Sequence, residues 1–270
     1  EISACLVGSE MCIRDRIQKL ELTPAMLALD PCSGSIVVTD TETGQVRAMA
    51  IYPSYDNNKL TNVIDSDYYD KITSDKTTPM YNRATMQRTA PGSTYKMLVS
   101  AAGLGEGVID VGSVITDYGT FTKISPSPKC WLTGGHGALG LAEAIEVSCN
   151  GFFYEVGYRL ATDSNGVYQD AQGIDKLQKY ATLFGLNRKS GVEIEEIDPH
   201  ISDSDAVRSA IGQGTNNYTP VQLSRYVTAI ANEGKCYDLT LVNEIKNVEG
   251  RTVYKNDNVP ESTIDLTDSQ

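Results

Sequence analysis

A serine and a lysine stand three positions apart in the segment 90–97, where the sequence predicts the start of a helix. Side chains at i and i+3 share one helix face, so a helix would hold Lys96 beside the hydroxyl of Ser93. That hydroxyl is a weak nucleophile until a base takes its proton, and a partly desolvated lysine can act as that base. Backbone N–H groups at a helix start also point toward a developing oxyanion. The pair predicts an acylatable serine, whereas the alternative is a solvated serine and lysine on an ordinary helix.

A second short motif, Ser148-Cys149-Asn150, follows downstream. Each motif by itself is expected about once by chance in a chain of this composition, so neither alone identifies a function. Other blocks of the chain therefore decide between the alternatives.

The region resembles the transpeptidase domain of penicillin-binding proteins, in particular the monofunctional class B members, whose motif set is S-x-x-K, S-x-N and K-T-G. Further blocks resemble the family in the family's order, and together they cover roughly residues 22 to 250. These blocks are 51–56, 81–84, 130–131, 135–137, 211–214 and 219–223.

The resemblance implies an α+β fold, with helical layers around a mainly antiparallel five-stranded sheet. It also implies a serine D,D-transpeptidase that cross-links peptidoglycan stem peptides ending in D-Ala-D-Ala and is acylated by β-lactams. Ser93 would be the nucleophile and Lys96 its base. Ser148 would pass a proton to the leaving nitrogen, and Asn150 would bind Lys96 and the substrate amide.

The resemblance further implies that the turn of Gly212, Gln213 and Gly214 binds substrate. It also implies that the protein acts in a cell-wall synthesis complex at the outer face of a bacterial cytoplasmic membrane, held there by an N-terminal anchor that is absent from this chain. No cofactor and no metal are implied.

The third family motif is expected to be missing. The chain contains Lys189-Ser190-Gly191, but this triplet precedes the turn at 212–214, whereas the family's third motif follows it. We interpret residues 17–270 as the N-terminal and central part of a transpeptidase domain that stops before the K-T-G strand. A pseudoenzyme is the alternative. Because two strands alone are marginally stable, the 270-residue chain is expected to fold poorly, expose apolar surface and acylate little.

Charge and composition exclude some functions. A net charge of −12 argues against nucleic-acid binding, which needs a basic face. No apolar run approaches the roughly 20 residues that cross a bilayer. Residues 3–16 do not fit the family and resemble translated sequencing-adapter sequence, so we interpret 1–16 as a non-native junction; a genuine lead-in is the alternative.

The cysteines and histidines show no local ligand spacing, so the sequence predicts no zinc site. Cys32, Cys130, Cys149 and Cys236 are expected to be buried thiols, with a disulfide among them left open, and Cys149 is expected to serve packing. Of the two histidines, His136 lies between glycines and is expected to be structural rather than part of a Ser-His-Asp triad.

Local patterns predict the elements. Strands are expected at 35–40 and 45–51 around a tight turn, and a late hairpin at 239–248 and 252–255. Residues 53–90 and 107–137 are expected to be connections. Helices are expected at 22–29, 93–104, 139–147, 152–160, 175–184 and 220–232, the last capped by Thr219 and Pro220.

Three other functions share some of these motifs. A class A β-lactamase needs a second base, and residues 155–165 contain no E-x-x-L-N. A β-lactam-sensing receptor domain would use acylation as a signal. A structural scaffold would not be acylated at all.

Overall fold

The computed structural model describes residue 19 and residues 33–264, so the helix predicted at 22–29, the thiol of Cys32 and the segment 1–16 lie outside the described residues. The chain divides into two compact units. One comprises Glu1–Ser35 and Ala50–Asn82, and the other comprises Ile36–Met49 and Arg83–Gln270.

The first unit contains a 3-10 helix, η2 (Asn57–Leu60), and an α-helix, α3 (Ser66–Ser74). The side chain of Asp65 accepts the Tyr68 N–H at 3.0 Å and caps α3. The prediction of a plain connection at 53–90 was therefore wrong for this stretch. Ile72 is the only buried residue of α3, so this polar stretch carries too few apolar residues to mark a helix in the sequence.

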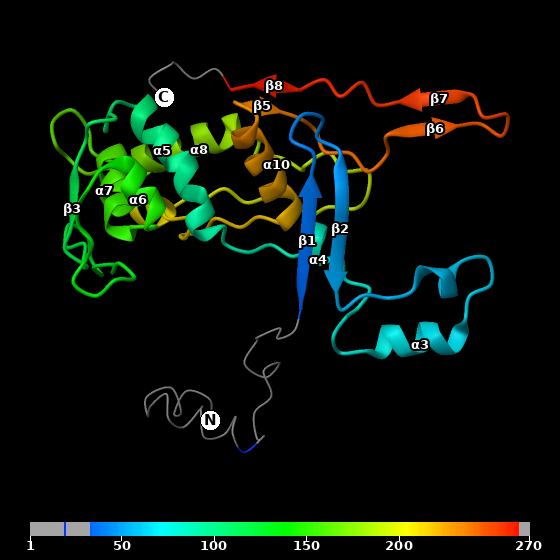
Figure 1. Cartoon of the computed structure of the whole chain (residues 1–270). Helices are drawn as coiled ribbons and strands as arrows, with labels where there is room; N and C mark the ends of the chain where they lie inside the picture. Colours follow the sequence, from blue (N-terminus) through cyan, green and yellow to red (C-terminus); the bar gives the residue numbers. More distant parts are fainter. Residues whose placement is uncertain (1–18, 20–32, 265–270) are drawn as a thin grey trace. The chain divides into compact units, whose positions relative to one another are not determined.

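The predicted N-terminal hairpin is confirmed as β1 (Gly34–Thr39) and β2 (Val46–Tyr52), shown in blue in Figure 1. Its turn closes with the Asp40 N–H donating to the Gln45 carbonyl at 2.8 Å. Val37 and Val46 pack on a small core that includes Val221 of α10 (Pro220–Ala231). The hairpin thus packs toward α10 with residues of both β1 and β2.

The helices of the second unit form its main core, with α5 lying against α7 and α8 (Figure 1). α10 begins as predicted, with Thr219 and Gln222 forming a capping box and Pro220 in the first turn. The bounds of the other helices are α4 Arg83–Met86, η3 Gly92–Tyr95, α5 Lys96–Gly105, α6 Leu141–Glu146, α7 Asn150–Leu160, α8 Asp170–Leu183 and α9 Ala206–Ser209.

The described residues form four two-stranded sheets, β1–β2, β3–β4, β5–β8 and β6–β7, and no five-stranded sheet. The late hairpin is confirmed in shorter form as β6–β7. The connection predicted at 107–137 was wrong where β3 pairs with β4, because three-residue strands carry no readable period. The remaining strands are β3 Ile115–Asp117, β4 Gly137–Leu139, β5 Lys235–Cys236, β6 Glu244–Lys246, β7 Thr252–Lys255 and β8 Ser262–Thr263.

Apolar side chains are exposed on one face of β1. Ile36 is 66 % exposed and Val38 is 47 % exposed, on the face opposite Val37. Within 33–264, none of the helices combines the length and the apolar character that crossing a bilayer requires.

Candidate active site

Ser93 lies in η3, one turn before α5, so the helix predicted at 93–104 is confirmed. Tyr226 of α10 fixes this helix start, because its hydroxyl donates to the Thr94 carbonyl at 2.9 Å and accepts the Leu98 N–H at 3.1 Å. The position of Ser93 is thus held from a helix far along the chain.

Lys96 is buried, with 2 % of its surface exposed, and its ammonium reaches the second motif. Nζ donates to the Ser148 carbonyl at 2.8 Å, to the Ser148 hydroxyl at 3.0 Å and to Oδ1 of Asn150 at 2.8 Å. The Ser148 hydroxyl in turn donates to Oγ of Ser93 at 2.9 Å. The expected proximity of Lys96 and Ser93 is therefore realised through Ser148, which bridges the amine and the alcohol.

Burial lowers the pKa of Lys96 to about 8, and the nearby thiols of Cys149 and Cys130 oppose this shift more weakly. The Phe153 ring, 5.5 Å from Nζ, contributes to the apolar surroundings. A lysine with this pKa has a useful neutral fraction near pH 7 and can accept a proton.

Ser148 occupies the link between α6 and α7, as predicted, whereas Asn150 is already the first residue of α7. Ser148 has a φ of 52°, which is uncommon for a residue with a side chain. Its N–H donates to the Ile145 carbonyl at 3.0 Å. The indole N–H of Trp131, a residue that the sequence analysis named within the block 130–131 without giving it a role, donates to the Ser148 carbonyl at 3.1 Å.

The turn at 212–214 is only partly beside the nucleophile. Gly212, with φ 72°, touches the residue before Ser93: the Gly92 N–H donates to its carbonyl at 3.1 Å. Gly214 faces the hydroxyls of Ser209 and Ser202 instead. Gln213 is exposed, and its backbone carbonyl accepts the side-chain amide of Asn216 at 3.0 Å. The substrate-binding role of the three residues stays a prediction.

The triplet at 189–191 belongs to a different network, in agreement with its rejection as the third motif. The Ser190 hydroxyl is buried and donates to Glu196 at 2.8 Å, and Glu196 also accepts from Gln222 at 2.8 Å. Lys189 is exposed and lies 3.8 Å from Asp198.

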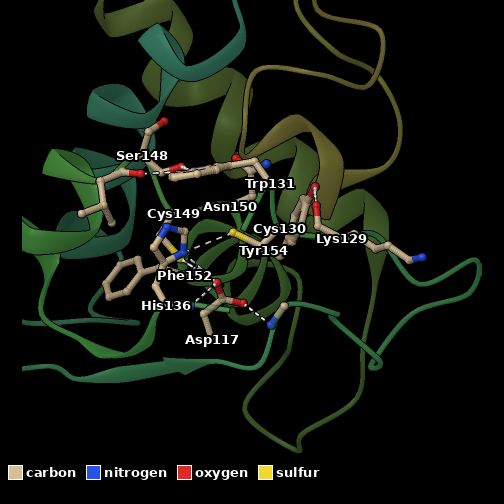
Figure 2. Close-up of polar contacts among 12 residues, drawn as sticks. Asp117, Lys129, Cys130, Trp131, His136, Ser148, Cys149, Asn150, Phe152 and Tyr154 are labelled. Carbon is tan, nitrogen blue, oxygen red and sulfur yellow. Dashed lines mark hydrogen bonds and ion pairs between the residues drawn. The ribbon is translucent and has the colours of Figure 1, made fainter. Parts of the chain in front are cut away.

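A buried cluster of four potential metal ligands lies directly below the second motif (Figure 2). One ligand atom from each of Asp117, Cys130, His136 and Cys149 lies within 4.8 Å of the others. His136 Nδ1 is 3.0 Å from Asp117 Oδ2 and 3.4 Å from the Cys130 sulfur, and the Cys149 thiol donates to the same Oδ2 at 3.3 Å.

Two sulfurs, one imidazole and one carboxylate form a donor set that suits tetrahedral Zn²⁺. The Gly119 N–H donates to the other Asp117 oxygen at 2.8 Å, and the Phe152 N–H donates to the Cys149 sulfur at 3.3 Å, so the ligands are held by outer contacts. The side chains thus meet in a geometry that local spacing did not indicate, while the prediction of no zinc site stays a prediction. The four residues come from separate segments, and a search for closely spaced ligand pairs does not find them.

Two members of the cluster, Cys149 and Asp117, have strongly shifted pKa values. Burial raises the pKa of Cys149 to about 12, so its thiol is not a nucleophile. Burial alone would raise the pKa of Asp117, but hydrogen bonds led by those from His136 and Cys130 bring it to about 2. The described contacts of His136 are with Asp117, Cys130 and Trp131, and none is with Ser93, which agrees with a structural role.

A serine bridged to a buried, weakly basic lysine is an arrangement suited to acyl transfer. The sequence model of the penicillin-binding protein transpeptidase domain matches residues 34–270, so the chain belongs to this family. The peptidoglycan D,D-transpeptidase MrdA of Haemophilus influenzae is 31 % identical over 224 residues, which are 77 % of this chain and 33 % of that protein. The chain thus spans about a third of the length of this curated relative.

Solved structures confirm the fold class. Helicobacter pylori penicillin-binding protein PBP2, solved in complex with MreC, matches with a TM-score of 0.68 and 26 % identity, covering 77 % of this chain and 39 % of that one. The imipenem acyl-enzyme of Mycobacterium tuberculosis penicillin-binding protein A matches with a TM-score of 0.70 and 25 % identity, covering 83 % and 52 %.

Proposed function

We propose that the protein is a serine D,D-transpeptidase that cross-links peptidoglycan and is acylated by β-lactams. The observation that carries the proposal is the continuous chain of contacts from Ser93 through Ser148 to Lys96, whose pKa is lowered to about 8 by burial. Membership of the transpeptidase family and the acyl-enzyme described for the mycobacterial relative support it.

In the proposed reaction, Ser93 attacks the carbonyl carbon of the penultimate D-alanine of a stem peptide. Its proton passes to the neutral amine of Lys96, with the Ser148 hydroxyl as the bridge between the two. The C–N bond breaks, a proton returns through Ser148 to the leaving nitrogen, and D-alanine departs. An amine of a second stem peptide then attacks the ester, forming the cross-link and freeing Ser93.

Asn150 orients the amine by accepting from Lys96 at 2.8 Å, and the turn at 212–214 binds substrate. The cross-linked substrate lies outside the cytoplasmic membrane, so the domain works there. The MreC complex described for the Helicobacter relative supports action within a cell-wall synthesis assembly.

Hydrolysis of the acyl-enzyme is disfavoured by the position of the acid that follows the second motif. Glu155 accepts from Lys123 at 2.8 Å and from Arg159 at 3.0 Å, and so is not a free base beside Ser93. A long-lived ester separates a transpeptidase from a β-lactamase.

The test is acylation of the full-length protein by a fluorescent penicillin, with the adduct located by peptide mass spectrometry. We expect one adduct on Ser93, none in Ser93→Ala, and normal labelling of the matched variant Ser164→Ala, which changes an exposed serine elsewhere. Circular dichroism checks that each variant is folded. An adduct on another residue, or no adduct on the folded protein, would refute the proposal, and a lifetime of minutes or less would indicate a β-lactamase.

A further inference from the structure

Trp131 combines an exposed ring with a fully used N–H group. The side chain is 62 % exposed, yet its Nε1 donates to the Val147 carbonyl at 3.2 Å and to the Ser148 carbonyl at 3.1 Å. Burial of apolar area therefore does not account for the position of this ring, whereas the two backbone contacts do.

The Ser148 carbonyl receives two donors, Nε1 of Trp131 and, at 2.8 Å, Nζ of Lys96. A non-glycine residue with φ 52° persists only where its surroundings hold it there. The hydroxyl of the same residue bridges Lys96 and Ser93, so any rotation of this peptide unit would move the bridging oxygen.

The indole ring of Trp131 is itself held by a contact with His136. Its ring meets the His136 imidazole edge to face at 4.9 Å between centroids, and His136 is bound to the buried Asp117 at 3.0 Å (Figure 2). The donor is thus supplied by a fixed ring rather than by a mobile surface side chain.

We propose that Trp131 is a positioning residue for the acylation reaction: its indole N–H holds the Ser148 peptide so that the Ser148 hydroxyl bridges Lys96 and Ser93. This inference rests on the proposed function. Trp131 acts through Ser148 and takes no part in bond making. Removing the N–H while keeping the ring should therefore slow acylation and leave the initial binding of a β-lactam nearly unchanged.

The experiment compares the full-length protein with two variants at position 131, Trp131→Phe and a site-specific 3-benzothienylalanine, which keeps the shape of indole and replaces N–H by sulfur. Rapid-quench labelling with benzylpenicillin gives the dissociation constant and the acylation rate constant separately. We expect the rate constant to fall about five- to tenfold in both variants, as for one lost hydrogen bond, with the dissociation constant within about twofold of wild type. The matched control Tyr118→Phe alters a 79 % exposed aromatic residue and should change neither constant.

Each outcome is informative. Unlabelled wild-type protein refutes the proposed function, whereas labelled wild type with unchanged rate constants in both variants overturns only the role of Trp131. If the variants showed a raised dissociation constant and an unchanged rate constant, the ring would be a substrate contact. This result would also overturn the positioning role of Trp131. If the variants did not fold, wild-type protein carrying 5-fluorotryptophan at 131 should show a ¹⁹F shift on acylation that Ser93→Ala lacks, and an unmoved resonance would count against the proposal.

Discussion

The rate of acylation of Ser93 should depend on pH with a midpoint set by Lys96. The amine must be neutral to accept a proton, and burial lowers its pKa to about 8. At this pKa the neutral fraction is about 1 % at pH 6 and about 50 % at pH 8, so the acylation rate should rise roughly 50-fold over this interval. Above pH 8 the rate should gain only about another twofold, because the amine is then mostly neutral.

An exposed lysine would behave differently. With the ordinary pKa of 10.5, the rate would continue to rise about tenfold for each pH unit beyond pH 8. The point at which the rate levels therefore measures the desolvation of Lys96. The direction follows from the burial, since the charged form is disfavoured and activity is lost as the pH falls.

The assay is rapid-quench acylation of the full-length protein by benzylpenicillin between pH 6 and pH 10. The carboxylate of this β-lactam stays ionised throughout, so the enzyme alone titrates. Circular dichroism at each pH excludes unfolding as the cause, and Lys96→Ala serves as the control without the amine. Three results would refute the assignment to Lys96. The acylation rate could be flat from pH 6 to pH 8, or it could still rise tenfold per pH unit at pH 9. The third is the same rise between pH 6 and pH 8 in Lys96→Ala.

Two further perturbations test the surroundings of the site. In Gly212→Ala the new Cβ would lie 2.1 Å from the Gly92 carbonyl oxygen, at a φ of 72°. We therefore expect the free energy of unfolding to fall by about 1–3 kcal/mol, measured by urea denaturation, and acylation to slow, measured by penicillin labelling. Unchanged stability would contradict the close approach of Gly212 to Gly92. Dialysis against Zn²⁺ should load about one equivalent and raise the melting temperature, and Cys130→Ser should abolish both effects, as judged by elemental analysis and scanning calorimetry. Equal zinc content in the two proteins would show that the cluster is not the binding site.

The elements predicted correctly are those with local signals. The turn at 41–44 between two β-branched runs predicted the β1–β2 hairpin, and Thr219 followed by Pro220 predicted the start of α10. The motif residues Ser93, Lys96 and Ser148 also meet as expected, because a helix start and a link between two helices can both be read from short windows.

The elements missed are those fixed by distant partners. β3 exists because Ile115 pairs with Leu139, across a glycine-rich loop that carries no strand period. The metal-capable cluster likewise joins Asp117 to Cys149 over 32 residues. The bridging position of Ser148, in place of a direct contact between Lys96 and Ser93, depends on this tertiary packing and not on helix spacing.

The packing also explains why the two short motifs are poor predictors by themselves. Asp117 can approach the start of α7 only because position 151 is glycine: a Cβ there would lie 2.1 Å from the Asp117 Oδ1 atom. Asp117 then binds Cys149, the middle residue of the second motif, while Trp131 holds the carbonyl of Ser148. A chain that carried both motifs by chance would lack these contacts. Nothing would then hold the serine of its second motif at the φ of 52° that Ser148 has here. The chemistry is therefore encoded in the motifs, but the geometry that makes it available is encoded in residues outside them.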